Sequence, residues 1–271
     1  MAKCNFFCTF VQVIFADSHT HFYFEDFRED LQDCFERALK AGVKVMIIPN
    51  VDSETIQPVS EICKRFPENC FPSIGLHPTH VNQTYRTELD IMLKAANTHH
   101  YYAIGEAGLD LYHDKTFLSE QIEVFETQIQ LAKEKKMPLI IHSRDAFEET
   151  MKVLKRLNDG SLRGVFHCFT GSVEQAKRIV DLGFYLGIGG VVTFRNSKLW
   201  QVIEAFDLEH ILLETDAPFI APDPYRGKRT EPAYIPLIAQ RIAEIKNIPL
   251  ELVAEKTTTQ TLKLFDINGN G

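Results

Sequence analysis

The chain has 271 residues, of which 45% are hydrophobic and 24% are charged, and this composition excludes a disordered protein. Its formal net charge of −8 argues against the broad basic surface with which non-specific DNA-binding proteins displace counterions, so any contact with nucleic acid is expected to be local. The longest apolar runs fall short of the about 18 residues that a membrane span needs.

The N-terminal segment imitates a signal peptide only in part. Lys3 precedes the apolar run CNFFCTFVQVIFA, but Ile14 stands where a small residue should precede a cut after Ala16. We therefore expect this run to contain the first strand. The cysteines form no C-x-x-C pair and lie mostly in apolar segments, which indicates buried thiols in a reducing compartment and predicts a cytoplasmic location. They are Cys4, Cys8, Cys34, Cys63, Cys70 and Cys168.

Short apolar runs alternate with amphipathic stretches along the chain, which is the pattern of repeated βα units around a parallel sheet. The predicted strands cover residues 10–21, 43–51, 70–78, 101–110, 138–145, 164–170, 184–194 and 210–219. Near-continuous apolar strands indicate burial on both faces, as in a sheet closed into a barrel. Eight such units favour an α/β fold of the (β/α)8 TIM-barrel type, with residues 1–271 as one domain.

Three helical patterns between the strands carry recognisable ends. The first covers residues 27–42, with Gly42 as its C-cap, and the second covers residues 118–136. The third covers residues 172–183 and opens on Ser172, with Glu174 close behind.

Two later segments depart from the regular repeat. Gly187, Gly189 and Gly190 crowd the seventh strand, which indicates a close backbone approach or a bulge. Residues 220–234 are rich in proline and charge and too polar for the core. This last connection is predicted to be a loop on the active face.

Metal-ligand side chains recur at the C-terminal ends of the predicted strands, where barrel enzymes carry their catalytic residues. His19 and His21 lie two apart in an extended segment, so both rings project from one face and reach one point. A single histidine at a strand end is more often a hydrogen-bonded structural residue, but recurrence on strand after strand favours a metal centre. The set is His19, His21, His77, Glu106, His142, His167 and Asp216.

This set is larger than one ion needs, and hydrolytic centres often hold two ions about 3.5 to 4 Å apart. Histidine with carboxylate suits Zn, Mn or Fe and is less natural for Mg, which prefers oxygen. We therefore expect two divalent metal ions, Zn, Mn, Mg or Fe, among which the sequence does not choose.

Six motifs in order along the chain resemble those of one family. They are DSHTH, GLHP, IGEAGLD, PLIIHSRDA, FHCFTGS and LLETDAPF…RGKRTEP. The sequence from Val13 to about residue 265 is thereby similar to the TatD-type metal-dependent deoxyribonucleases of the metal-dependent hydrolase barrel superfamily. In much of that superfamily a carboxylated lysine on the fourth strand bridges the ions. Glu106 takes that place here, which weakens phosphotriesterase-like and dihydroorotase-like interpretations.

The resemblance implies a division of the ligands between two ions. His19 and His21 would hold the first ion with Asp216, and His142 and His167 would hold the second. Glu106 would bridge the pair and, with Asp216, act in catalysis. A water held between the ions would become a hydroxide near neutral pH, and Asp216 would orient or deprotonate it.

Further residues are expected around the ligands. His77 is similar to a family histidine near the substrate phosphate, and Arg144 offers a planar fork for phosphate oxygens unless it pairs with Asp145 or Glu214. Glu214 is expected to support a histidine ligand from behind. In the last loop, Lys228 and Arg229 either contact the nucleic-acid backbone or form a solvated charge pair.

Two positions depart from the family pattern. Thr230 stands where members often have asparagine, and His113 lies near a position where they often have arginine, which casts doubt on substrate preference. His113 is a candidate phosphate contact. Tyr112 is a candidate base-stacking residue, although an aromatic in an apolar loop more often packs.

The favoured function is a metal-dependent hydrolase that cleaves DNA phosphodiester bonds, with single strands or 3′ ends as substrate and 3′ to 5′ exonuclease activity implied by the family. An alternative is hydrolysis of a small ester, lactone or amide, or of an aminoacyl ester on tRNA, at the same centre. A third is a metal-binding barrel that acts through protein partners. The retained ligand set argues against the third, and no obligate protein partner is evident.

Overall fold

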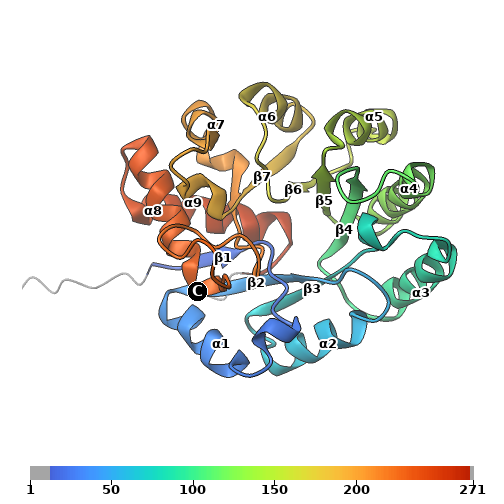
Figure 1. The fold of residues 1–271 in the computed structure, drawn as a ribbon, viewed down its shortest axis with the longest axis horizontal. Coiled ribbons are helices and arrows are strands. Elements are labelled where there is room, and N and C mark those ends of the chain that lie inside the picture. The colour runs from blue at the N-terminus through green and yellow to red at the C-terminus, as the bar shows by residue number, and fades with distance from the viewer. Residues whose placement is uncertain (1–12, 269–271) are drawn as a thin grey trace, which may run out of the picture.

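The computed structural model describes residues 13–268, and its eight parallel strands form one sheet in chain order from β1 to β8. The last strand lies beside the first, where the Ser18 N–H donates to the Leu213 carbonyl at 2.8 Å and Thr20 bridges to Ala217. Figure 1 looks along this nearly closed barrel and shows the helices as an outer ring. The predicted (β/α)8 TIM barrel is confirmed.

The strands are shorter than their apolar runs. They are β1 Phe15–Asp17, β2 Val43–Pro49, β3 Cys70–Ile74, β4 Ala103–Asp110, β5 Leu139–Arg144, β6 Gly164–Phe166, β7 Phe184–Ile188 and β8 Ile211–Leu213. Most predicted strands therefore extend several residues too far, because their last residues are buried at the barrel mouth but lie beyond the ladder. The start of the predicted first strand, residues 10–12, lies outside the described residues, as do Cys4 and Cys8.

Helices follow each strand on the outside of the barrel. The α-helices are α1 Leu31–Lys40, α2 Ile56–Arg65, α3 Tyr85–Thr98, α4 Leu118–Lys135, α5 Phe147–Leu157, α6 Val173–Val180, α7 Leu199–Ala205, α8 Ile235–Lys246 and α9 Leu250–Leu264. Short 3-10 turns are η1 Glu25–Phe27, η2 Pro78–His80, η3 Gly190–Thr193, η4 Leu208–His210 and η5 Pro232–Tyr234.

The three helices with recognisable ends form where they were predicted, with local differences. The first begins as α1 at Leu31 rather than at residue 27, and Gly42 follows α1 with a φ of 90°, which suits a helix C-terminus. α4 agrees closely with the predicted 118–136. Ser172 begins α6 through a capping box whose partner is Gln175 rather than Glu174, because the third helical residue is the one that reaches back.

The hydrophobic core has two parts, one on each side of the strands. Alternate residues face outward to the helices, for example Leu139 and Ile141, while Ile140 faces the barrel interior with Val165. Leu264, Phe265 and Ile267 pack against the interior residues at the strand starts. The C-terminal segment thus closes the end of the barrel at which the strands begin, opposite the mouth formed by their C-terminal ends. No pattern in the sequence had indicated this contact.

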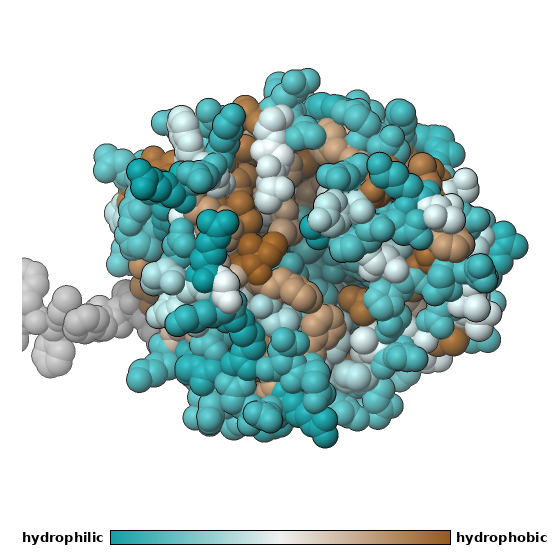
Figure 2. All heavy atoms as spheres, viewed as in Figure 1, coloured by the Kyte–Doolittle hydropathy of each residue, from teal (hydrophilic) through white to brown (hydrophobic). Residues whose placement is uncertain are grey.

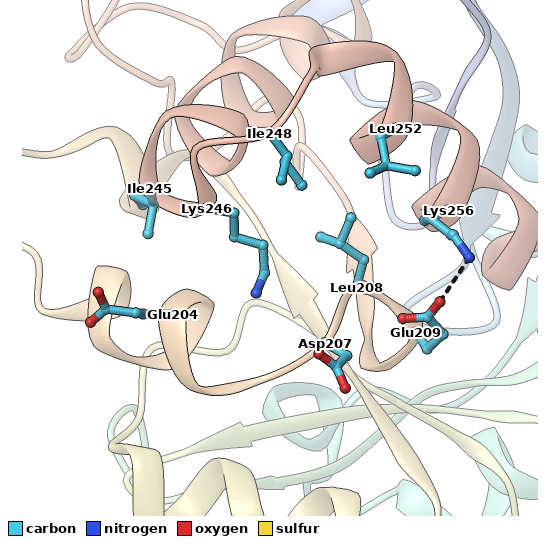
Figure 3. A pocket seen from close by; sticks show the side chains of 9 residues that line it. All are labelled: Glu204, Asp207, Leu208, Glu209, Ile245, Lys246, Ile248, Leu252 and Lys256. Atoms are coloured by element: carbon cyan, nitrogen blue, oxygen red, sulfur yellow. Dashed lines mark hydrogen bonds and ion pairs between the residues drawn. The ribbon is translucent and has the colours of Figure 1, made fainter.

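A cavity of about 420 Å³ lies on the outside of the barrel, between α7 and η4 on one side and α8 and α9 on the other (Figure 3). A pair between Lys256 and Glu209 at 3.0 Å lies at its edge. None of the predicted site residues lines it. The lining side chains are Glu204, Asp207, Leu208, Glu209, Ile245, Lys246, Ile248, Leu252 and Lys256.

Two further sequence predictions concern thiols and membranes. Cys34, Cys63, Cys70 and Cys168 are free thiols, and the first and third of these are buried. No helix within residues 13–268 combines the length and the apolar character needed to cross a bilayer.

Candidate metal centre

Side chains from six strand ends meet in the barrel mouth. Ile140 and Val165 face the barrel interior, so His142 and His167, two residues further along, project from the same face of their strands. Leu212 and Glu214 are related in the same way. The alternation that builds the interior core therefore also aims polar groups at one point above it.

The first group of side chains surrounds one oxygen of Glu106. His19 Nε2 lies 3.2 Å from Glu106 Oε2, and His21 Nε2 lies 3.6 Å from the same oxygen. Asp216 Oδ1 lies 3.6 Å from each of the two nitrogens, which are 3.1 Å apart. Three strands, β1, β4 and β8, thus contribute to this group.

The second group surrounds the other oxygen of Glu106. His142 Nδ1 and His167 Nε2 each lie 2.8 Å from Glu106 Oε1, and His77 Nε2 lies 3.2 Å from it. His77 Nε2 is also 3.2 Å from His142 Nδ1. His77, which was expected near a substrate phosphate, lies within reach of the candidate ligands Glu106 and His142.

The donor set fits divalent cations better than a hydrogen-bond network. A neutral imidazole has one N–H, yet His19 Nε2 faces His21 Nε2, Glu106 and Asp216 at 3.1 to 3.6 Å. One proton on that nitrogen satisfies one of these neighbours, whereas a cation between them satisfies all. Within residues 13–268, three overlapping sets have the geometry to hold an ion, namely His19 with His21 and Glu106, His19 with His167 and Asp216, and His77 with Glu106 and His142.

The centre keeps its carboxylates ionised. Burial opposes ionisation of Glu106, but the nearby His167, His77 and His19 outweigh it and hold the pKa of Glu106 well below its usual range. For His77, burial disfavours the charged imidazolium and lowers the pKa to about 4. At neutral pH Glu106 is therefore an anion, and His77 is a neutral imidazole with a free lone pair, which are the forms that bind metal.

Most of the candidate histidines have a partner behind the ring. His21 Nδ1 lies 3.2 Å from the Tyr23 hydroxyl, and His77 Nδ1 lies 2.6 Å from the Thr79 hydroxyl. Glu214 Oε1 lies 3.7 Å from His167 Nδ1, which is beyond hydrogen-bond distance, unlike the hydroxyl partners of His21 and His77. Such partners fix ring orientation and the position of the remaining proton.

Asp110 is a site residue that the sequence reasoning missed. Its Oδ2 lies 3.0 Å from His142 Nε2, and its Oδ1 accepts hydrogen bonds from the backbone N–H groups of Tyr112 and His113, both at 2.9 Å. A signal was present, because Asp110 follows Glu106 by four residues in the same strand and thus shares its face.

Two glutamines of α4 hold the strand ends that carry these residues. Gln121 Oε1 accepts from the Asp110 N–H at 2.9 Å, and Gln128 Oε1 accepts from the Leu76 N–H at 2.8 Å. The glutamines are two helical turns apart, so they lie on the same face of α4. Leu76 directly precedes His77 and lies beyond the end of β3, so Gln128 fixes a segment that has left the ladder, while Gln121 fixes the last residue of β4.

The glycines of the seventh repeat allow a close approach, as predicted. A Cβ on Gly187 would lie 2.3 Å from Glu214 Oε2, and a Cβ on Gly190 would lie 2.3 Å from the Ile220 carbonyl oxygen. The Glu214 side chain is fully buried, and Gly187 supplies the space that it fills.

Replacing Gly187 by alanine is therefore expected to lower the free energy of unfolding by about 1 to 3 kcal/mol, because the added methyl overpacks the buried Glu214 carboxylate. Chemical denaturation measures this loss. Gly189→Ala is the matched control, since its added Cβ would come no closer than 3.6 Å to another residue. Equal stability of the two variants would contradict the prediction.

The predicted substrate contacts lie at the mouth beside β4 and β5. The Arg144 guanidinium lies over the Tyr112 ring at 4.0 Å from its centroid, and Tyr112 is 59% exposed. Among the described residues Arg144 forms no ion pair with Asp145 or Glu214. His113 Nδ1 lies 2.8 Å from Asp110 Oδ2, and its side chain is half exposed.

The last loop is less exposed than its composition suggested. Arg229 pairs with Asp30 through both terminal nitrogens at 2.7 and 2.8 Å, so its charge is already engaged within the chain. Lys228 lies over the Tyr225 ring. Thr230 and Glu231 are buried, which corrects the expectation that this whole segment is too polar for the core.

Comparison with known proteins agrees with this geometry. The family model described as TatD related DNase matches residues 16–266. The chain is 40% identical to the uncharacterized metal-dependent hydrolase YabD of Bacillus subtilis, over 93% of this chain and 99% of that protein. It is 34% identical to the 3′-5′ ssDNA/RNA exonuclease TatD of Salmonella typhimurium, over 89% of this chain and 95% of that protein.

A solved structure shares the whole fold. The crystal structure of YjjV, a TatD homologue from Escherichia coli K12, is 31% identical and superposes with a TM-score of 0.86, covering 94% of this chain and 98% of that one. The residues matched by the family model, 16–266, include every strand end of the centre. The chain therefore belongs to the TatD related DNase family and is a metal-dependent hydrolase.

Proposed function

We propose that the protein hydrolyses phosphodiester bonds of single-stranded DNA at 3′ ends, with two divalent metal ions. The observation that carries the proposal is the position of Glu106, whose two carboxylate oxygens face separate groups of histidines. A carboxylate that serves two groups in this way suits a bridge between two ions. The name of the Salmonella relative supports single-stranded nucleic acid as the substrate class.

In this proposal the ligands of the two ions come from different strand ends. His19, His21 and Asp216 would hold one ion, and His142 and His167 would hold the other with His77 beside them. Bound divalent ions lower the pKa of water and offset the negative charge that a phosphodiester gains during attack.

Asp216 is the group proposed to orient the attacking water and to take its proton. Its side chain keeps 13% of its surface exposed, more than the 3% of Glu106, so one side of the carboxylate is reachable from the mouth. Nearby His21, His167 and His19 outweigh its burial and lower its pKa, which keeps it ionised as a base must be.

The substrate side of the mouth is proposed to be formed by Arg144, His113 and Tyr112. The exposed Arg144 fork presents N–H groups toward solvent beside the centre, and the half-exposed His113 ring lies next to it with Nδ1 engaged by Asp110. The local charge of Arg144 suits contact with one phosphate, in keeping with the overall charge of −8. The free thiols support the predicted action in a reducing compartment such as the cytoplasm.

The test is a metal analysis followed by a substrate panel. The purified chain is expected to hold about two divalent ions and to shorten a 5′-labelled single-stranded oligonucleotide from its 3′ end. Chelation should abolish shortening, and returned Zn, Mn, Mg or Fe should restore it. Metal binding without cleavage of DNA or RNA, together with turnover of an ester, lactone or aminoacyl-tRNA, would replace this proposal with the small-ester alternative.

A further inference from the structure

Two phenylalanines, the exposed Phe219 and the partly buried Phe24, form an aromatic edge directly beside the first group of ligands. Phe24 lies in the loop after β1 and its ring stacks on the His21 ring, with centroids 4.8 Å apart and planes 14° apart. Phe219 lies in the loop after β8, with its ring centroid 5.9 Å from that of Phe24 and 6.2 Å from that of His21. Phe219 is 47% exposed.

The position of Phe219 is fixed by the ligand loop itself. Its N–H donates to the Asp216 carbonyl at 2.8 Å, which closes a tight turn between ligand and ring. Phe24 supports the ring from the side in an edge-to-face contact. The Phe219 ring is therefore fixed in position and exposed to solvent, and it lies close to the candidate ligands His21 and Asp216.

A second aromatic surface lies across the mouth. Tyr112 follows β4, while Phe24 and Phe219 follow β1 and β8, and these strands are on opposite sides of an eight-stranded barrel. Figure 2 shows hydrophobic residues beside the hollow at the centre of this face. A ligand whose phosphate reaches the metal centre would therefore have an aromatic surface on either side of that phosphate.

We propose that Phe219, supported by Phe24, stacks on the base of a nucleotide next to the scissile bond and so selects unpaired nucleotide ends. The inference rests on the proposed function and adds to it a preference for unpaired nucleotide ends. Aromatic side chains stack on any base because every base has a π-face, and in a duplex these faces are covered by neighbouring base pairs. A nucleobase fits this edge because the phosphate attached to it reaches the ligands at the same time.

The test compares oligonucleotides that differ only in one base. One substrate has normal 3′-terminal nucleotides, and two others carry an abasic site at the terminal or the penultimate position. The protein is expected to prefer the normal end over one of the abasic ends by about 5- to 150-fold in kcat/KM, since stacking contributes about 1 to 3 kcal/mol per base. Phe219→Ala should remove this preference, and Phe219→Trp should keep it.

Trp200→Ala serves as the matched control, because Trp200 is an aromatic residue with 44% exposure on the outer helix α7. It should leave the preference unchanged. Cleavage of all three substrates at equal rates, or a Phe219→Ala variant that keeps the preference, would overturn the stacking inference while the nuclease function stands. No cleavage of any oligonucleotide would overturn the proposed function and this inference with it.

Discussion

Replacing Glu106 by alanine is expected to lower kcat/KM by about a thousandfold or more and to reduce the bound metal to at most about one ion per chain. The two oxygens of Glu106 face the two groups of histidines, so its loss weakens both candidate sites together. Stabilisation of transition-state charge by bound metal is worth several kcal/mol, and each 1.4 kcal/mol is about tenfold in rate.

The measurement pairs elemental analysis with the oligonucleotide assay. Glu106→Gln tests the charge alone, because it keeps the shape of the side chain but replaces one oxygen with an amide group that cannot bind a cation. Glu123→Gln on α4 is the matched control. It also removes one carboxylate charge, but from a half-exposed side chain that pairs with Arg86 on the surface. Far-UV circular dichroism and thermal unfolding exclude a folding defect. Full metal content and near-normal turnover in Glu106→Ala would refute the bridging role.

Much of the architecture was predictable because the pattern that builds a barrel is local. Each apolar run predicts a strand, and each amphipathic stretch predicts an outer helix, so the order of β1 to β8 followed from the chain alone. The strand ends were less predictable. The predicted strand 164–170 stops pairing as β6 at Phe166, and Cys168 then takes a φ of 48°, a turn that burial patterns do not register.

The candidate ligands were also predictable, since each one follows a buried run and residues of this type recur at one strand end after another. What the sequence could not provide was register between strands. Gly108 lies opposite His142 and Asp110 lies opposite Arg144, so the contact between Asp110 and His142 depends on how β4 pairs with β5. The position of Glu214 against Gly187 and the engagement of Arg229 by Asp30 arise between distant segments in the same way.

The contact with Asp110 leads to a second large expected effect. Asp110 Oδ2 lies 3.0 Å from His142 Nε2, and an ionised carboxylate can only accept. With a metal ion beside Glu106, His142 Nδ1, which faces Glu106 at 2.8 Å, would bind the ion through its lone pair, and the one proton of a neutral His142 would be on Nε2, where it donates to Asp110. Asp110 thus supports the tautomer of His142 that leaves Nδ1 available to a metal ion.

Asp110→Asn should reverse this arrangement. The backbone N–H groups of Tyr112 and His113 both donate to Oδ1, so the amide oxygen of the variant will occupy that place and its NH2 group will face His142 Nε2. His142 Nε2 must then accept, which moves the proton to Nδ1 and blocks the nitrogen that faces Glu106. One of the two metal affinities is expected to fall by about 10- to 100-fold, and activity should fall with it.

Metal titration by calorimetry measures both affinities, and nitrogen NMR of histidine-labelled, metal-loaded protein reports the tautomer of His142. His113→Ala is the informative comparison, because it removes the other partner of Asp110 Oδ2 but leaves the carboxylate facing His142. It should cost less metal affinity than Asp110→Asn. If Asp110→Asn binds both ions as tightly as the unaltered protein, His142 does not depend on Asp110. The second ion would then be held by groups other than the Nδ1 lone pair of His142.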